Sequence, residues 1–377
     1  MKKIGLLLLC TLPLVLSSCF PTSEQNASTN SKNLTKSNEP TPASIDVELD
    51  KNLLVKADIT GGEKKDYNIN FISLKDLNND VLKQSFLDNK ELAETNEDNN
   101  DFYPDYKDKY YQFSDNSYML IELGSFRFED TFYSNREYSD VIYGSNYFIR
   151  SDLQDIYKKI TIDNINRNEA IEKVKDAANA IGVANLGKPN VIALDLETLE
   201  SEWEDYEQKD GGHPRKWEKA DEAYVVTFPV VHDNTTITNK GYFSTVAEIP
   251  VIGSRVLGVV NKDGIIALTL NGIYDIGKTL TNKVNPISLE DALKVVKSKY
   301  KDVLLTDPII ISKIAMEYVP TLAKKDSINY ELIPAWVFTA KQDLKSSDKK
   351  GSYTAPVYFT IIIDAETGQE LRIGSEY

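Results

Sequence analysis

The chain has 377 residues and a formal net charge of −15, with 58 acidic against 43 basic side chains. This balance argues against binding to nucleic acid or to an anionic membrane surface, which both require clustered lysine and arginine. With only two cysteines and two histidines, the chain has few residues for thiol chemistry or metal binding. Its apolar fraction of 41% is enough to form packed cores. The length favours two or three domains.

The first nineteen residues have the layout of an export signal. Lys2 and Lys3 form a positive start, and the apolar run Ile4–Leu16 follows. This run is shorter than the roughly 20 apolar residues that a membrane-spanning helix needs, so it is expected to belong to a signal peptide at residues 1–18. The run ends in Leu16-Ser17-Ser18-Cys19, which resembles the lipobox of bacterial lipoproteins. The resemblance implies acylation of Cys19, with membrane lipid as a partner, and a location on the outer face of the cell membrane.

The alternative is an ordinary secretory signal whose cysteine falls at the boundary by chance. Under the lipobox interpretation, processing removes Cys10 and acylates Cys19, so the exported protein has no disulfide. Residues 19–43 are rich in Ser, Thr, Asn and Pro and show no apolar periodicity, which indicates a flexible tether. A coil of this length reaches roughly 25–30 Å.

Residues 44–150 are expected to form an N-terminal domain. Apolar residues alternate over 45–49 and 53–59 around the turn-like Asp50-Lys51-Asn52, which predicts a β-hairpin. A further strand is expected at 67–71, and Ser73 has the character of an N-cap for a helix. A single strand is expected over Tyr118–Phe128.

Aromatic residues are concentrated between Phe102 and Phe148. Tyrosine faces stack on sugars or dock peptides, so we predict partner binding by Tyr103, Tyr106, Tyr110 and Tyr111. The competing interpretation is that these tyrosines only build a sheet, since aromatic residues favour strands. The acidic residues Glu97, Asp98, Asp101, Asp105 and Asp108 allow either weak calcium binding or a solvated loop.

Two similar units are expected at residues 151–280 and 281–377. Each opens with a capped helix, at Asn166-Arg167-Asn168-Glu169 and at Ser288-Leu289-Glu290-Asp291, followed by several strands. The strands are expected at 190–196, 223–231, 243–249, 255–270, 309–319, 330–340 and 357–363. A turn is expected at Asn261-Lys262-Asp263-Gly264. The recurring order suggests a tandem duplication.

The second unit resembles the PepSY and PepSY-like group of proteins. The resemblance rests on Ser288–Val296, on Ile333-Pro334-Ala335-Trp336 and on the hairpin Ile363–Leu371. The layout is also similar to the tandem modules of the YycH/YycI regulators and to lipoproteins of unknown function from Clostridia. The predicted fold is therefore α+β, with a mixed N-terminal domain followed by two tandem units in which a helix lies on an antiparallel sheet.

Catalytic residues are scarce. The two histidines, His213 and His232, lie in turn-like sequence, and no nucleophile elbow precedes either. The Ser-x-x-Lys pattern at Ser346–Lys349 falls in a polar loop, where lysine is not activated. The loop 197–221 carries Trp203 and Trp217, which are expected to be exposed and to contact a partner.

The sequence therefore predicts a lipid-anchored extracytoplasmic protein that binds an envelope protein or peptide without catalysis, cofactor, metal or nucleic acid. The alternative is a lipoprotein that binds carbohydrate or cell wall through its tyrosine-rich domain. An envelope hydrolase is disfavoured, because no nucleophile is paired with a base.

Overall fold

The computed structural model describes residues 42–64, 66–77, 90–103, 105–136, 138, 161–200, 216–244, 249–322, 330–348, 351–371 and 373–376. The predicted signal peptide, Cys19 and most of the tether lie outside these residues, as do Trp203 and His213. The described residues hold twenty β-strands and three α-helices. No helix among them is long and apolar enough to cross a membrane.

One sheet has seven strands: β1 (Ser44–Asp50), β2 (Leu53–Thr60), β3 (Tyr67–Leu74), β16 (Tyr274–Val284), β17 (Ile309–Leu322), β18 (Tyr330–Asp348) and β19 (Gly351–Asp364). Their order is β1-β2-β17-β18-β3-β16, and β19 pairs with β18 off this path. β2 and β17 run parallel, whereas the other pairs are antiparallel.

The predicted hairpin at the start of this sheet is confirmed. In β2, Leu53, Val55 and Ala57 are buried while alternate residues are more exposed, which is the period of a half-buried strand. The turn residue Asn52 has φ 62°, a conformation that asparagine tolerates better than most residues. Its side-chain amide donates to the Leu305 carbonyl at 2.8 Å, which holds the turn against the segment before β17.

A second sheet has eight strands: β4 (Leu92–Asn99), β5 (Lys107–Phe113), β6 (Tyr118–Glu122), β7 (Ser125–Glu129), β8 (Asn190–Leu194), β9 (Ala223–Pro229), β14 (Arg255–Asn261) and β15 (Gly264–Asn271). It is antiparallel, in the order β4-β5-β6-β7-β15-β14-β9-β8. The single strand expected over Tyr118–Phe128 is instead the hairpin β6–β7, which turns at Gly124 with φ 70°.

Two smaller sheets lie beside these. One pairs β10 (Val231–His232) with β11 (Thr235–Thr236), and the other contains β12 (Tyr242–Ser244), β13 (Ile249–Val251) and β20 (Ile373–Glu376). The short helices are α2 (Thr131–Asn135) and the 3₁₀ turn η2 (Lys219–Asp221).

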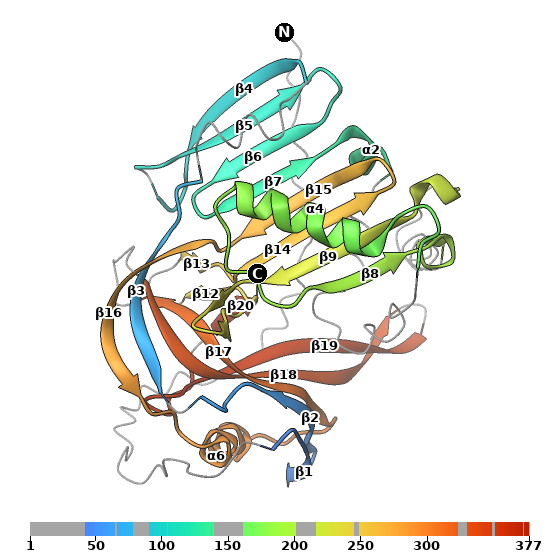
Figure 1. Cartoon of the computed structure of the whole chain (residues 1–377). Coiled ribbons are helices and arrows are strands. Elements are labelled where there is room, and N and C mark those ends of the chain that lie inside the picture. Colours follow the sequence, from blue (N-terminus) through green and yellow to red (C-terminus); the bar gives the residue numbers. More distant parts are fainter. Residues whose placement is uncertain are drawn as a thin grey trace. The chain divides into compact units, whose positions relative to one another are not determined.

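Both predicted capped helices are confirmed. In α4 (Arg167–Ala180) the Asn166 side chain accepts from the backbone N–H of Asn168 at 2.9 Å, and in α6 (Leu289–Tyr300) the Ser288 hydroxyl accepts from that of Asp291 at 3.0 Å. The helix α4 crosses β9, β14 and β15 (Figure 1), and α6 contacts β1 and β19. Their buried residues join one apolar core that includes strands of both large sheets.

Gly258 allows α4 to approach β14. A Cβ atom at this position would lie 2.4 Å from Val174 Cγ2 and 2.9 Å from its Cγ1, and Val174 is fully buried. We expect Gly258→Ala to lower the free energy of unfolding by about 1–3 kcal/mol through overpacking, measured by urea denaturation. The double variant Gly258→Ala/Val174→Ala restores the space, so its loss should be smaller than the sum of the two single losses. Additive losses would contradict this contact.

The predicted α+β class is wrong, because the protein is mostly β and its sheets are not tandem helix-on-sheet units of the PepSY kind. Strands distant in sequence share each large sheet: β7 pairs with β15, and β2 pairs with β17. The β-propensity of a segment indicates a strand but not its partner, which depends on non-local packing.

The sequence prediction also missed individual strands. β4 is exposed along its whole length and β16 along most of it. Neither strand therefore shows the alternation of apolar and polar residues by which a half-buried strand is recognised. Ser73, expected to cap a helix, lies in β3, and residues 78–89 of that expected helix lie outside the described part of the chain.

Candidate functional site

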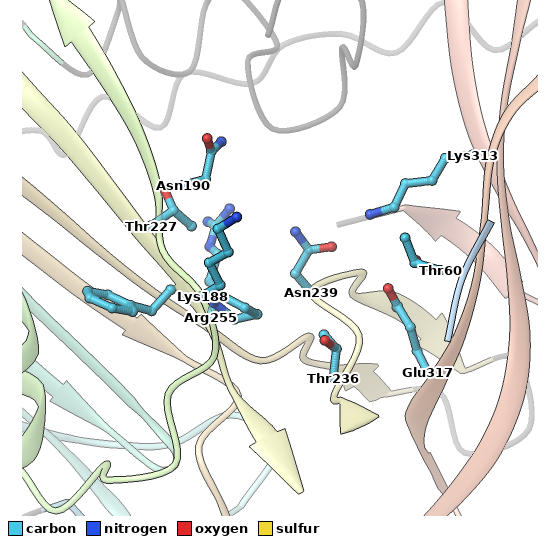
Figure 2. A pocket seen from close by; sticks show the side chains of 11 residues that line it. Thr60, Lys188, Asn190, Thr227, Thr236, Asn239, Arg255, Lys313 and Glu317 are labelled. Carbon is cyan, nitrogen blue, oxygen red and sulfur yellow. The ribbon is translucent and has the colours of Figure 1, made fainter. Parts of the chain in front are cut away.

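A cleft contains two adjacent cavities. The smaller cavity, drawn in Figure 2, lies between residues of the two large sheets, and the larger one lies between residues of the seven-stranded sheet and of the β10–β11 turn region. The cavities have volumes of about 300 Å³ and about 570 Å³. Thr60, Thr236 and Glu317 line both, so the two cavities adjoin each other. Cavity volumes in this range accommodate small ligands or a few side chains of a larger partner.

One wall of the smaller cavity comes from the eight-stranded sheet. The register places Asn190 of β8 opposite Thr227 of β9, and Arg255 of β14 opposite Pro229. Lys188 lies two residues before β8 and lines the same wall. Residues from three strand ends therefore meet here, although they are distant in the sequence.

The facing wall is formed by Lys313 and Glu317 of β17 and by Thr60, the last residue of β2. A register shift between Ile311 and Lys313 interrupts the pairing of β17 with both neighbours. Before it Ile311 is buried, whereas after it Lys313 is exposed and Ile314 is buried. A bulge re-aims side chains in this way, and Figure 2 shows Lys313 pointing into the cavity toward Asn239.

The two cavities carry opposite charge. The smaller one, called the cationic cavity below, is lined by Lys188, Arg255 and Lys313 against the single carboxylate of Glu317. The larger one, called the acidic cavity, is lined by Glu63, Asp233 and Glu317 against Lys64 alone. Lys64 is already engaged, since its Nζ lies 3.8 Å from Asp233 Oδ2 and 5.1 Å from the Tyr67 ring centroid.

His232 lies beside the acidic cavity in a fixed environment. Its Nε2 is 2.7 Å from Asn70 Nδ2 and 3.7 Å from Asp233 Oδ2, and its ring centroid is 5.4 Å from that of Tyr318. An amide nitrogen only donates, so Nε2 accepts from Asn70 and its lone pair is occupied. Burial also raises the pKa of the neighbouring Tyr67 to about 12, which keeps that phenol protonated.

Burial lowers the pKa of His232 below its ordinary value of 6.5, and the Asp233 carboxylate opposes the shift without cancelling it. The folded protein therefore binds this proton more weakly than the unfolded chain does. Stability should be retained above about pH 6.5 and lost as the pH falls through the lower folded pKa. In urea denaturation between pH 7.5 and pH 5, the wild type should lose more stability than His232→Gln. Parallel pH profiles for the two proteins would contradict this.

The predicted binding tyrosines do not line the cleft. Tyr103 and Tyr111 are buried, at 8% and 5% exposure, and the Tyr103 hydroxyl is hydrogen-bonded to that of Tyr330. Tyr106 and Tyr110 are half-buried: the Tyr106 hydroxyl donates to Asp76 Oδ1 at 3.3 Å, and the Tyr110 hydroxyl donates to Gln112 Oε1 at 2.5 Å. Tyr103 and Tyr111 belong to the apolar core, and Tyr106 packs against it.

The expected exposure of Trp217 is wrong, because only 2% of this side chain is exposed. Its ring centroid lies 5.5 Å from that of Tyr138, and Arg136 Cζ lies 5.6 Å from the ring. A polar loop sequence gave no sign of this burial, which depends on contact with residues about 80 positions earlier.

The acidic segment, for which weak calcium binding and a solvated loop were the two alternatives, forms contacts within the protein. Glu97 lies 3.5 Å from Lys109 Nζ, and Asn100 Nδ2 donates to Asp108 Oδ1 at 2.9 Å. Over the ranges that the structure covers, no group of three or more His, Cys, Asp or Glu side chains is arranged to hold a metal ion.

The cleft residues were not predicted from the sequence. They lie between positions 60 and 317, and most are ordinary Thr, Asn, Lys, Arg or Glu residues within their own strands or loops. Since no short motif connects them, only the strand pairing brings them together.

Comparison with protein-family models and with curated proteins gave no match. Among solved structures, the chain is similar to the crystal structure of an uncharacterized protein from Eubacterium rectale ATCC 33656. The TM-score is 0.65 at 16% sequence identity, and the similarity covers 88% of this chain and 94% of that one. At this level of identity the comparison shows that the two chains share a fold.

Proposed function

We propose that this protein is a lipid-anchored binding protein on the outer face of the cell membrane, and that it holds an envelope protein or peptide in the cleft without chemical turnover. The observation that carries the proposal is the cleft itself. Its two walls belong to different sheets of one compact unit, and polar and charged side chains from both walls line it.

Two further features support binding rather than catalysis at this cleft. The nearby His232 has its Nε2 engaged by Asn70, so it is poorly placed to accept a proton from a substrate. The tyrosines predicted to bind a partner are buried or half-buried, and Tyr103, Tyr106 and Tyr110 are hydrogen-bonded within the protein, which favours the cleft over the tyrosine-rich surface.

A photo-crosslinking residue in place of Asn239, which lines the cleft, tests the binding site in living cells. We expect an adduct with one envelope component from this position and none from Lys262, which lies in the distant β14–β15 turn. Adducts from Tyr106 or Tyr110 but not from Asn239 would support the tyrosine surface instead.

The anchor is tested separately. Cys19→Ala removes the only thiol at the predicted processing site, so the protein should leave the membrane fraction and fail to incorporate labelled fatty acid. The matched control is Ser18→Ala, which keeps a small residue beside Cys19 and should remain lipidated. Membrane association retained by Cys19→Ala would contradict acylation at this position.

A further inference from the structure

We infer that the cationic cavity is an oxyanion subsite that binds a carboxylate or phosphate group of the ligand. The inference rests on the proposed binding function and specifies what the cleft recognises. The chain carries a net charge of −15, yet three cationic side chains and only one carboxylate line this cavity. A local excess of positive charge in an acidic protein attracts and orients anionic groups.

The cations come from both walls of the cavity. Lys188 and Arg255 belong to the eight-stranded-sheet side, and Lys313 projects from β17 on the other side (Figure 2). Within the described part of the chain, neither Lys188 nor Lys313 forms an ion pair. An anion between the walls would therefore be contacted from two directions, with lysine supplying point charges and arginine a planar fork suited to carboxylate or phosphate.

The uncharged lining suits the same ligand. Asn190, Asn239 and Thr236 provide amide and hydroxyl donors around the cations, and Asn239 lies between the two walls. Phe228 and Pro229 add an apolar patch that would contact the carbon skeleton carrying the charge.

The adjoining acidic cavity makes the two ends of the cleft opposite in charge. Glu317 lines both cavities, whereas Glu63 and Asp233 line only the acidic one. An oxyanion would be repelled from that end, so it should occupy the cationic cavity while neutral or basic parts of the ligand extend toward Tyr67. This polarity distinguishes a subsite from a general positive surface.

The experiment uses the folded protein with citrate and pyrophosphate as probes, titrated calorimetrically at low ionic strength. We expect saturable binding of at least one probe, weakened by added salt. Tighter binding of citrate would indicate a carboxylate ligand, and tighter binding of pyrophosphate a phosphate ligand. If neither probe bound saturably, the proposal would be overturned.

Variants assign the binding to this cavity. The double variant Lys188→Gln/Lys313→Gln should weaken probe affinity about tenfold or more, because it removes cations from both walls. The matched control Lys173→Gln/Lys262→Gln changes the net charge equally at exposed positions in α4 and the β14–β15 turn, and should change affinity less than about twofold. An equal loss in both double variants would overturn the subsite.

Glu317→Gln provides a test of opposite sign that does not depend on how well the lysine variants fold. Removing the one carboxylate should tighten binding, whereas unchanged or weaker binding would count against the proposal. The experiments also distinguish a failure of the oxyanion subsite from a failure of the proposed binding function. An adduct at Asn239 in cells without oxyanion binding would refute this inference alone, and oxyanion binding without that adduct would refute the proposed function.

Discussion

Asp221→Asn is expected to lower the free energy of unfolding by about 3 kcal/mol or more, because it removes one partner of a buried ion pair. Asp221 is only 1% exposed, and Arg136 Nε donates to its Oδ1 at 2.6 Å while the second guanidinium nitrogen pairs with Oδ2. The backbone N–H of Glu218 also donates to Oδ2 at 2.7 Å. Neutralising the carboxylate leaves a partly buried guanidinium without its counter-charge.

The measurement is the urea midpoint, with Lys219→Ala as the matched control. Lys219 lies in the same 3₁₀ turn and pairs with Asp163 at 3.1 Å, but both side chains are mostly exposed. Exposed pairs contribute about 0–1 kcal/mol, so the control should change little. If Asp221→Asn cost no more than Lys219→Ala, the buried pair would not be a major source of stability.

Trp336→Ala is expected to cost about 3–5 kcal/mol, since it empties a large buried volume. Trp336 is 2% exposed in β18, where it pairs with Met316 of β17 and Ile363 of β19. Its indole N–H donates to the Ile287 carbonyl at 3.1 Å, just before α6 begins. The side chain thus connects the centre of the seven-stranded sheet to the entry of that helix.

Trp336→Phe separates packing from hydrogen bonding. It keeps an aromatic ring but leaves the Ile287 carbonyl without its donor, so it should cost clearly less than Trp336→Ala and still more than about 1 kcal/mol. Hydrogen exchange in α6 should become faster in both variants. Val357→Ala, at a 42% exposed site in β19, should stay within about 0.5 kcal/mol of the wild type. Equal stability of the tryptophan and alanine proteins would contradict the assigned role.

Several elements could be predicted because their signals are local. The caps at Asn166 and Ser288 set the starts of α4 and α6 through hydrogen bonds spanning two or three residues. The Asn261–Gly264 turn is fixed by its own side chain, since Asn261 Oδ1 accepts from the backbone N–H of Asp263 at 2.9 Å and of Gly264 at 3.1 Å. Such contacts need no information from elsewhere in the chain.

The predicted fold class was wrong because the pairing of strands depends on contacts between residues that are distant in the sequence. Strands such as β2 and β17 pair across about 250 residues of sequence, and nothing in either strand specifies the other. The order of helices and strands along the sequence resembled two tandem units. In the structure, however, the seven-stranded sheet combines β1, β2 and β3 with β16, β17, β18 and β19, from both ends of the chain. Burial was misjudged for the same reason: Trp217 lies in a polar sequence and is covered by residues that only the fold brings to it.

The sequence by itself determined the local elements and the prediction of a lipid anchor at Cys19, since caps, turns and a signal peptide are read from a few neighbouring residues. Tertiary structure alone decided the sheet partners and the cleft. Lys188, Arg255 and Lys313 become one site only because the starts of β8 and β14 lie near Lys313 within β17, where a bulge turns this side chain out of the core. The physical reason is that charges act over a few ångströms of space, whatever their separation along the chain.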